Sequence, residues 1–201
     1  MNQDTITSFS TFTLQLPDWL PEYLINIPAH FSTIDQKMTF VTELARLNVK
    51  YRTGGPFAAA VFDSITNRLV APGVNLVTTS HVSIAHAEIV ALTLAQHAVG
   101  HHDLGAEGHS PHELVTSTEP CAMCLGAIPW SGIRTLICGA RDEDARDIGF
   151  DEGTKPPNWV NTLHARGIVV TQDIHRHKAI QVLQDYAKDG GSIYNGRQST
   201  P

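Results

Sequence analysis

Residues 116–127 read TSTEPCAMCLGA, in which two cysteines lie three residues apart where a predicted strand gives way to a predicted helix. Residues i and i+3 of a helix share a face, so the sulfurs of Cys121 and Cys124 point to the same side. The helix N-terminus and a metal ion both lower the pKa of a thiol, which favours thiolates at both positions. The chain has 3 cysteines, and this odd, low number argues against a disulfide framework. The pair is therefore either a redox pair or a pair of metal ligands.

A second motif, His86-Ala87-Glu88, opens another predicted helix. One imidazole and two thiolates make three zinc ligands, His86, Cys121 and Cys124, and three ligands leave a position open for water. Zinc lowers the pKa of that water to about 7, which supplies hydroxide at neutral pH. Glu88 does not share a face with His86, so we expect it to act as a base beside the water. An H-x-E motif followed by P-C-x-x-C is the mark of zinc deaminases, and we expect one Zn²⁺ per chain.

The charge balance argues against a polynucleotide substrate. The 201 residues include 14 Lys and Arg against 20 Asp and Glu, a formal net charge of -6, whereas a protein that grips a nucleic-acid backbone needs a basic surface. No apolar run approaches the ~20 residues that span a bilayer, and the N-terminus lacks the pattern of a secretory signal. We therefore expect a cytoplasmic protein that acts on a small molecule, with no nucleic-acid partner and no membrane partner.

Hydrophobic periodicity predicts a single α/β domain. A helix over 34–50 precedes a β-hairpin, and helices then alternate with strands, which predicts a mixed sheet covered by helices on both faces. The predicted units are an irregular extension over 1–31, a zinc-dependent deaminase domain over 32–188 and a tail over 189–201. The predicted strands are 57–62, 68–77 with a break at Pro72-Gly73, 113–117, 134–140 and 167–171, and the remaining helices are 87–99, 121–130, 141–148 and 174–188.

These motifs and two glycine-containing segments resemble the cytidine and deoxycytidylate deaminase superfamily. The segments are GPF at 55–57, before the first strand, and GVN at 73–75, on the second. Residues 145–152, ARDIGFDE, resemble more narrowly the bacterial guanine deaminases, in which Gly-Phe-Asp is followed by an acid. The resemblance implies a cytidine-deaminase-like three-layer α/β/α domain with a mixed five-stranded sheet, assembled as a homodimer or larger.

The same resemblance implies a reaction and a set of site residues. The reaction is the zinc-dependent hydrolysis of guanine to xanthine and ammonia, a step of purine catabolism. The C-terminal segment would be exchanged between subunits and would cover the partner's pocket, with Tyr186 or Tyr194 as the closing residue. The implied roles are zinc binding by His86, Cys121 and Cys124, catalysis by Glu88 and Glu152, and substrate binding by Asn75, Ala87, Asp151 and Glu152.

Three other functions share most of these residues. Adenosine deamination in tRNA uses the same catalytic set but needs a basic surface. The second alternative is deamination of a cytosine-type base, a nucleoside or an aminotriazine such as ammeline. The third is a non-catalytic zinc-bearing binding protein, which would keep the ligands but would not need Glu88.

Other conspicuous side chains have plainer expected roles. Met123 and Trp130 follow the CxxC motif on a helix that must bury one face, so we expect both in the core. Cys138 stands among apolar strand residues and is expected to be a buried structural thiol. Five histidines in and beside a loop over 100–111 match no zinc spacing, and we expect them to be solvated. They are His97, His101, His102, His109 and His112.

Overall fold

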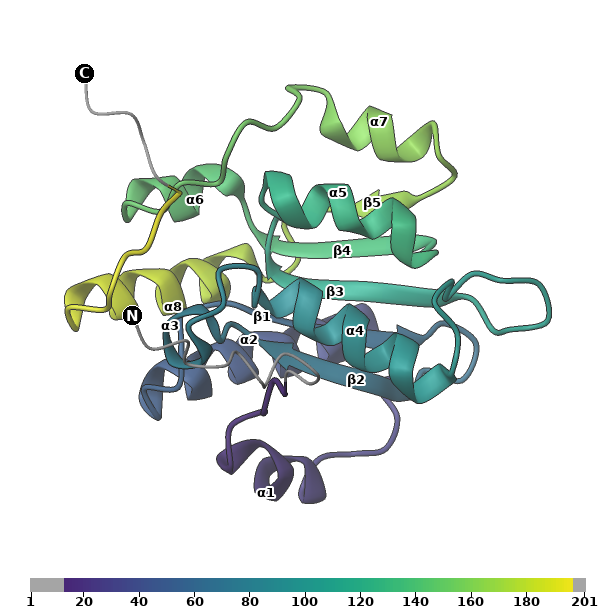
Figure 1. The fold of residues 1–201 in the computed structure, drawn as a ribbon, viewed down its shortest axis with the longest axis horizontal. Helices are drawn as coiled ribbons and strands as arrows, with labels where there is room; N and C mark the ends of the chain where they lie inside the picture. The colour runs from purple at the N-terminus through teal and green to yellow at the C-terminus, as the bar shows by residue number, and fades with distance from the viewer. Residues whose placement is uncertain (1–12, 197–201) are drawn as a thin grey trace, which may run out of the picture.

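The computed structural model describes residues 13–196 and contains a mixed sheet (Figure 1). Its strands are β1 (Ala58–Asp63), β2 (Leu69–Val74), β3 (His112–Thr118), β4 (Thr135–Ala140) and β5 (Val169–Thr171). The order β2-β1-β3-β4-β5 makes β3 the central strand. β1 pairs antiparallel with β2 and β3, whereas β3, β4 and β5 run parallel. The predicted five-stranded mixed sheet is confirmed.

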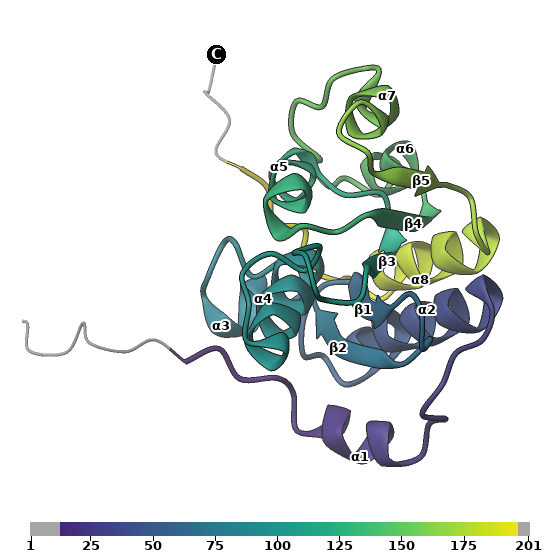
Figure 2. The same cartoon turned by 90° about the vertical axis from the view of Figure 1, so that its right-hand side faces the viewer.

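Helices cover both faces of the sheet (Figure 2). They are α1 (Trp19–Ile25), α2 (Ile34–Lys50), α3 (Val77–Ser80), α4 (Ala87–Val99), α5 (Ala122–Ser131), α6 (Asp142–Asp147), α7 (Trp159–His164) and α8 (Arg176–Lys188). α2 and α8 lie on one face, and α4, α5 and α7 lie on the other. Neighbouring residues of β3 alternate between these layers: Leu114 packs with the core of α4 and α5, and Val115 with the core of α2. Every residue of β3 is buried because both faces of this strand are covered, and its sequence HELVTST therefore also buries polar side chains.

The helix predicted over 34–50 has the observed bounds of α2. Of the two residues that precede it, Ser32 and Thr33, Thr33 is the cap. Its hydroxyl accepts from the Gln36 backbone N–H at 3.2 Å, and the Gln36 side chain accepts from the Thr33 N–H at 3.2 Å. This capping box satisfies an N–H group at the helix start that has no helical partner.

The second strand of the hairpin departs from its prediction. β2 runs through Pro72, which pairs with Ala60, so the expected break at Pro72-Gly73 is wrong. β2 lies at the edge of the sheet, where a missing N–H costs no ladder bond. Gly73 faces α4, and a Cβ there would lie 2.3 Å from the carbonyl oxygen of Ala87. The close approach of α4 to the strand therefore requires glycine.

The N-terminal extension is also more ordered than predicted over part of its length. An irregular structure is wrong for residues 19–25, which form α1. Pro21 is tolerated because it lies in the first helical turn, where backbone N–H groups have no intrahelical partner. Leu20 is fully buried in the core beneath α2, and the Trp19 indole donates to the Thr53 hydroxyl at 3.0 Å. Residues 1–12 of the predicted extension and 197–201 of the predicted tail lie outside the described residues.

Candidate functional site

A cavity of about 550 Å³ lies where β3 ends and α4 and α5 begin. Cavities of this size are typical of small-molecule sites. Residues far apart in the sequence meet there because the carboxyl ends of parallel strands and the N-termini of the following helices share one edge of the sheet. Its lining includes six of the predicted site residues, Asn75, His86, Glu88, Cys121, Asp151 and Glu152.

Three of the predicted site residues form a metal-binding group. One ligand atom each from His86, Cys121 and Cys124 lies within 4.8 Å of the others, the one such group found over residues 13–196. The His86 Nδ1 to Cys121 Sγ distance is 3.5 Å. A tetrahedral zinc ion with ordinary Zn–N and Zn–S bonds separates two such ligands by about 3.5 Å. The chemistry and spacing of these three donors therefore fit zinc.

The two helices position these ligands at their N-termini. His86 is the N-cap residue of α4 and Cys121 the N-cap residue of α5, both with extended backbone. The helix dipole favours a negative charge at that position. A hydrogen bond from the Cys124 thiol, together with one from His86, lowers the pKa of Cys121 to about 4. Cys121 is therefore a thiolate at neutral pH, whereas the same hydrogen bond and burial raise the pKa of Cys124, which would give up its proton when zinc binds.

Two buried carboxyl groups share the cavity with the metal-binding group. Glu88 is 6% exposed and Glu152 is 7% exposed. Burial, assisted by the charge of Cys121, raises the pKa of Glu88 to about 7 and that of Glu152 to about 8. Pairs of acids with strongly perturbed pKa values in a cleft are typical of sites that move protons.

The tail closes the cavity of its own chain. Tyr194, Asn195 and Gly196 belong to the lining. The Asn195 amide donates to the Gly149 carbonyl at 3.0 Å, and its oxygen accepts from the Asp151 N–H at 2.8 Å. The Tyr194 hydroxyl hydrogen-bonds the Asn75 side chain, and burial raises the pKa of Tyr194. Tyr186 instead lies behind the wall, where its hydroxyl donates to the Ser192 carbonyl at 2.7 Å.

Two further predicted substrate residues are placed differently from one another. Asp151 lines the cavity, but one of its carboxylate oxygens already accepts a hydrogen bond from the Gly153 N–H at 2.9 Å. The same oxygen lies 3.7 Å from the Arg146 guanidinium. Ala87 is fully buried among core residues and does not belong to the cavity lining. A role for Ala87 in substrate binding stays a prediction.

The structure also adds lining residues that lie within the quoted motifs but have no predicted role. Phe57 and Phe150 form part of the wall, with their rings edge to face at 4.9 Å. Such an aromatic wall suits a flat ring. Glu119 lines the cavity and pairs with the buried Lys155 at 3.4 Å. Sequence spacing offers no signal for this pair, since its members are 36 residues apart.

The helix after the CxxC motif buries a different face from the one expected. Trp130 is 86% exposed and Met123 is 37% exposed, so their assignment to the core is wrong. α5 buries Cys124, Ile128 and Ser131, which follow the i, i+4, i+7 pattern of one face. Trp130 stands two residues from Ile128 and therefore faces away from the core. The expected burial of Cys138 is confirmed.

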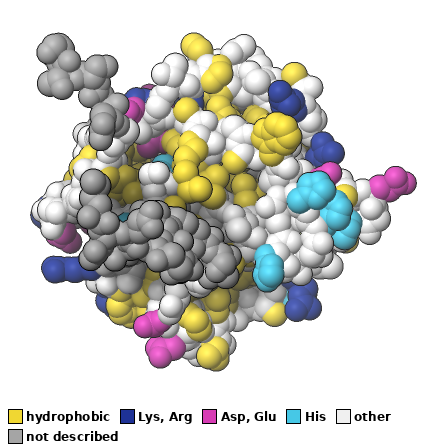
Figure 3. All heavy atoms as spheres, in the orientation of Figure 1, with side chains coloured by type: hydrophobic (Ala, Val, Ile, Leu, Met, Phe, Trp, Pro, Cys, Tyr) yellow, Lys and Arg dark blue, Asp and Glu magenta, His cyan; other side chains and the backbone are white. Residues whose placement is uncertain are grey.

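The histidine-rich loop projects from the end of the molecule opposite α8's tail, where histidine side chains gather on the surface (Figure 3). The His101 ring stacks on His102 at 4.7 Å and lies 5.2 Å from His109. His112 departs from the expected solvation: it is buried as the first residue of β3, with Nδ1 2.8 Å from the Leu104 carbonyl oxygen.

The fold and the metal-binding group together define a class of protein. Residues 32–140 match the model of the cytidine and deoxycytidylate deaminase zinc-binding region. The chain belongs to this family of zinc-binding deaminases.

Within the family, the chain is similar to guanine deaminases. The guanine deaminase of Nitrosomonas europaea has 46% identity and a TM-score of 0.84, covering 89% of this chain and 97% of that one. A solved complex with 2,6-diaminopurine has 47% identity and a TM-score of 0.85, covering 91% and 96%. The guanine deaminase of Bacillus subtilis is 38% identical over 109 residues, which are 54% of this chain and 65% of that enzyme. No helix within residues 13–196 has the length and apolar character of a membrane span.

Proposed function

We propose that this chain is a guanine deaminase, which hydrolyses free guanine to xanthine and ammonia. The observation that carries the proposal is the cavity itself, in which the zinc-binding group, Glu88 and Glu152 meet. The similar enzymes are guanine deaminases, and one similar solved chain binds 2,6-diaminopurine. His86, Cys121 and Cys124 would hold one zinc ion per chain, and zinc would lower the pKa of a water molecule bound at its open position.

Glu88 moves the protons in this mechanism. Hydrolysis breaks the bond between C2 of guanine and its amino nitrogen, and the oxygen of water takes the place of that nitrogen. The Glu88 carboxylate accepts a proton from the attacking water and gives it to ring N3 beside C2, which makes C2 more electrophilic. It then transfers the second water proton to the amino group, which leaves as ammonia. A pKa near neutrality, about 7 in the structure, suits a group that must accept and donate in turn.

Glu152 and Asn75 recognise the base. The Glu152 carboxyl group, whose pKa is raised to about 8, accepts a hydrogen bond from a ring N–H group through its unprotonated oxygen, and its burial makes a base without a matching donor costly to bind. Asn75 is 1% exposed, and its side-chain oxygen accepts the Val77 N–H at 3.3 Å, which holds the amide at the cavity wall. The base replaces the Tyr194 hydroxyl as a partner of Asn75, and Tyr194 then closes over it. Asp151 has a lesser part, since Gly153 and Arg146 already engage it.

Adenosine deamination in tRNA is the main competing function. It shares the catalytic residues, but the net charge of -6 disfavours a polynucleotide. Ammonia release measured on guanine, guanosine, adenine, cytosine, cytidine and ammeline separates the candidates, with a tRNA substrate assayed for inosine. We expect guanine to be the fastest substrate of the panel. Inosine formation in tRNA without ammonia release from guanine would overturn the proposal.

We also propose that the chain forms a homodimer. The highly exposed Trp130 lies on α5, and exposed large apolar side chains are typical of protein interfaces. Tyr194 lines the cavity of its own chain, and exchange of C-terminal segments between subunits stays a prediction. Light scattering of the purified chain and of Trp130→Ser tests the dimer; a monomeric parent chain contradicts it. A cytoplasmic location stays a prediction.

A further inference from the structure

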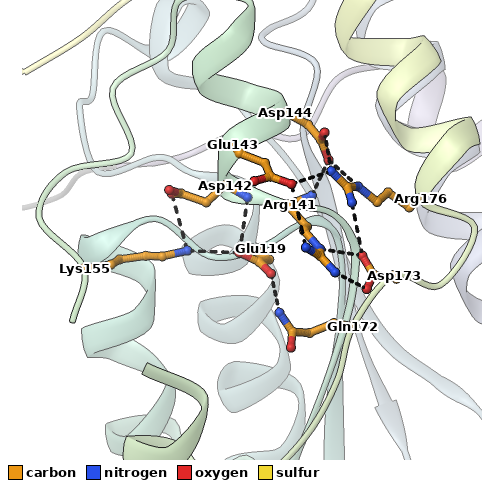
Figure 4. A network of polar contacts seen from close by, with 9 residues as sticks. All are labelled: Glu119, Arg141, Asp142, Glu143, Asp144, Lys155, Gln172, Asp173 and Arg176. Carbon is orange, nitrogen blue, oxygen red and sulfur yellow. Dashed lines mark hydrogen bonds and ion pairs between the residues drawn. The ribbon is translucent and has the colours of Figure 1, made fainter. Parts of the chain in front are cut away.

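Lys155 is a buried cation beside the cavity, and the mechanism above gives it no role. Its side chain is 7% exposed, and Nζ lies 3.4 Å from Glu119 Oε2 and 3.4 Å from Asp142 Oδ1. Nζ also lies over the Trp159 ring, 4.9 Å from its centroid. A lysine this deeply buried is stable only with such partners. Figure 4 shows that it points at the same carboxylate that other segments of the chain approach.

That carboxylate belongs to Glu119, which accepts hydrogen bonds from three donors. Besides Lys155, it accepts from the Gln172 side chain at 2.5 Å and from the Asp142 backbone N–H at 3.2 Å. Four segments are therefore held at one point: the end of β3, the start of α6, the loop after α6 and the residues after β5 (Figure 4). Glu119 itself lines the cavity and stands two residues before the zinc ligand Cys121.

Lys155 belongs to the loop that carries Glu152. This loop forms no helix or strand over 149–156, so its position depends on specific contacts. The Glu152 carbonyl accepts from the Ala122 N–H at 2.9 Å. Gly153 lies against the same residue: a Cβ there would be 2.9 Å from the Ala122 Cβ. The loop thus rests directly on the start of α5, with Lys155 as its anchor three residues beyond Glu152.

We propose that Lys155 is a positioning residue. Through its contact with Glu119, it holds Glu152 in place beside the start of α5, where Cys121 and Cys124 of the metal-binding group lie. Lys155 does not belong to the cavity lining, so it acts through the loop and not on the base. Displacement of a catalytic group by ~1 Å can cost roughly 100-fold in rate. This inference rests on the proposed function, because it explains how Glu152, a residue of that site, is held in its position.

The test compares Lys155→Met with a matched variant, Lys37→Met. Lys37 is the other deeply buried lysine among residues 13–196; it pairs with Glu113 and lies 5.6 Å from the Phe62 ring centroid. In Lys155→Met we expect kcat for guanine to fall roughly 10- to 100-fold with zinc content unchanged. Lys155→Arg keeps the charge and recovers part of the loss. Lys37→Met lowers the Tm but leaves kcat per folded molecule at the parental value.

Hydrogen exchange gives a readout that needs no substrate. Release of the loop exposes the Ala122 amide, so we expect peptides covering 120–124 and 149–156 to exchange faster in Lys155→Met and at the parental rate in Lys37→Met. Glu119 keeps its other two donors in Lys155→Met, and these contacts favour folding of the variant. If Lys155→Met does not fold, Lys155→Gln takes its place in both experiments.

The outcomes separate the inference from the proposed function. Parental kcat or parental exchange in Lys155→Met overturns the positioning role, as does an equal loss of kcat in Lys37→Met. A parent enzyme that releases no ammonia from guanine overturns the proposed function. The exchange rates then still decide whether Lys155 holds the loop.

Discussion

A buried lysine–glutamate pair stands at each end of the central strand β3. At its start, Glu113 pairs with Lys37 of α2; just beyond its end, Glu119 pairs with Lys155. Each lysine also lies over an aromatic ring, Phe62 or Trp159. The two pairs have the same chemistry. They lie at opposite ends of β3, and this position decides whether a pair affects only stability or also the cavity.

At the start of β3 the pair is remote from the cavity. Lys37 donates to Asn67 at 2.6 Å, and Asn67 stands in the β1–β2 turn with a φ of 57°. The contact therefore holds a hairpin turn against α2. At the other end, the helices begin at residues of the metal-binding group and the loops carry acids, so under the proposed function a structural contact there also positions reacting groups. Substitutions at the start of β3 should lower stability and spare turnover, whereas substitutions at its other end should lower turnover more than stability.

The largest effect is expected for Glu88→Gln, at the functional end. Removal of the proton carrier should lower kcat for guanine by roughly 10²- to 10⁴-fold, while the zinc content and Tm stay at the parental level. His86→Ala is the matched variant, since it should lose both zinc and activity. Elemental analysis and ammonia release distinguish the two. Near-normal turnover in zinc-loaded Glu88→Gln contradicts its assigned role.

The start of β3 should show the converse. Lys37→Met leaves Glu113 as a buried charge without its partner and should lower the free energy of unfolding by about 3 kcal/mol. Lys37→Met/Glu113→Leu should recover most of that loss, because an apolar pair replaces the ion pair. Denaturant titration measures both. A loss of kcat per folded molecule in either variant would erase the contrast between the two ends.

Removal of residues 189–201 should give a smaller, functional effect. The truncation opens the cavity wall that Tyr194 and Asn195 complete, so turnover of guanine should fall several-fold. Tm should change less than turnover, because among the described tail residues only Tyr194 packs against a core cluster. Tyr194→Ala is the point variant that should reproduce most of the loss. Full activity of the truncated chain would reduce the tail to a passive end.

The smallest effect is a pH dependence of stability in protein stripped of zinc with a chelator. The pKa of Glu152 is raised from 4.5 to about 8 and that of Glu88 to about 7, so the folded state binds more protons between those values and 4.5. Cys121 opposes this effect, because its pKa of about 4 makes the folded state bind one proton fewer over the same range. The two carboxyl groups outnumber the thiol between about 4.5 and 7, so the free energy of unfolding should fall as pH rises through this window. Glu152→Gln should flatten the fall, and rebinding of zinc should do likewise by lowering both pKa values. A parent whose stability rises across the window contradicts the raised pKa values.

Sequence reasoning predicted the residues of the candidate site better than the buried ion pairs that hold the surrounding loops in place. His86, Glu88, Cys121 and Cys124 are spaced locally along two helix starts, where helical geometry places Cys121 and Cys124 on one face and keeps Glu88 off the face of His86. Lys155 and Glu119 meet only through tertiary packing between two loops, which no periodicity encodes. Lys37 and Glu113 are 76 residues apart and are equally invisible to local patterns.

The errors have the same origin in tertiary context. Residues 1–31 are expected to be irregular and Pro72 is expected to interrupt a strand. Pro21 lies in a first helical turn and Pro72 in an edge strand, where a missing N–H group has little consequence. Trp130 is expected in the core because its helix must bury one face, yet α5 buries the opposite face. Apolar character alone does not say which face of a short helix meets the sheet.

The central claim is hydrolytic deamination of free guanine, and product analysis in water labelled with a heavy oxygen isotope tests it most directly. Purified zinc-loaded protein should convert guanine to xanthine that carries a single labelled oxygen, with ammonia released in equal amount. Glu88→Gln under the same conditions should give almost none. Mass spectrometry of the purine product measures both. Absence of xanthine, or xanthine without the label, would contradict the account.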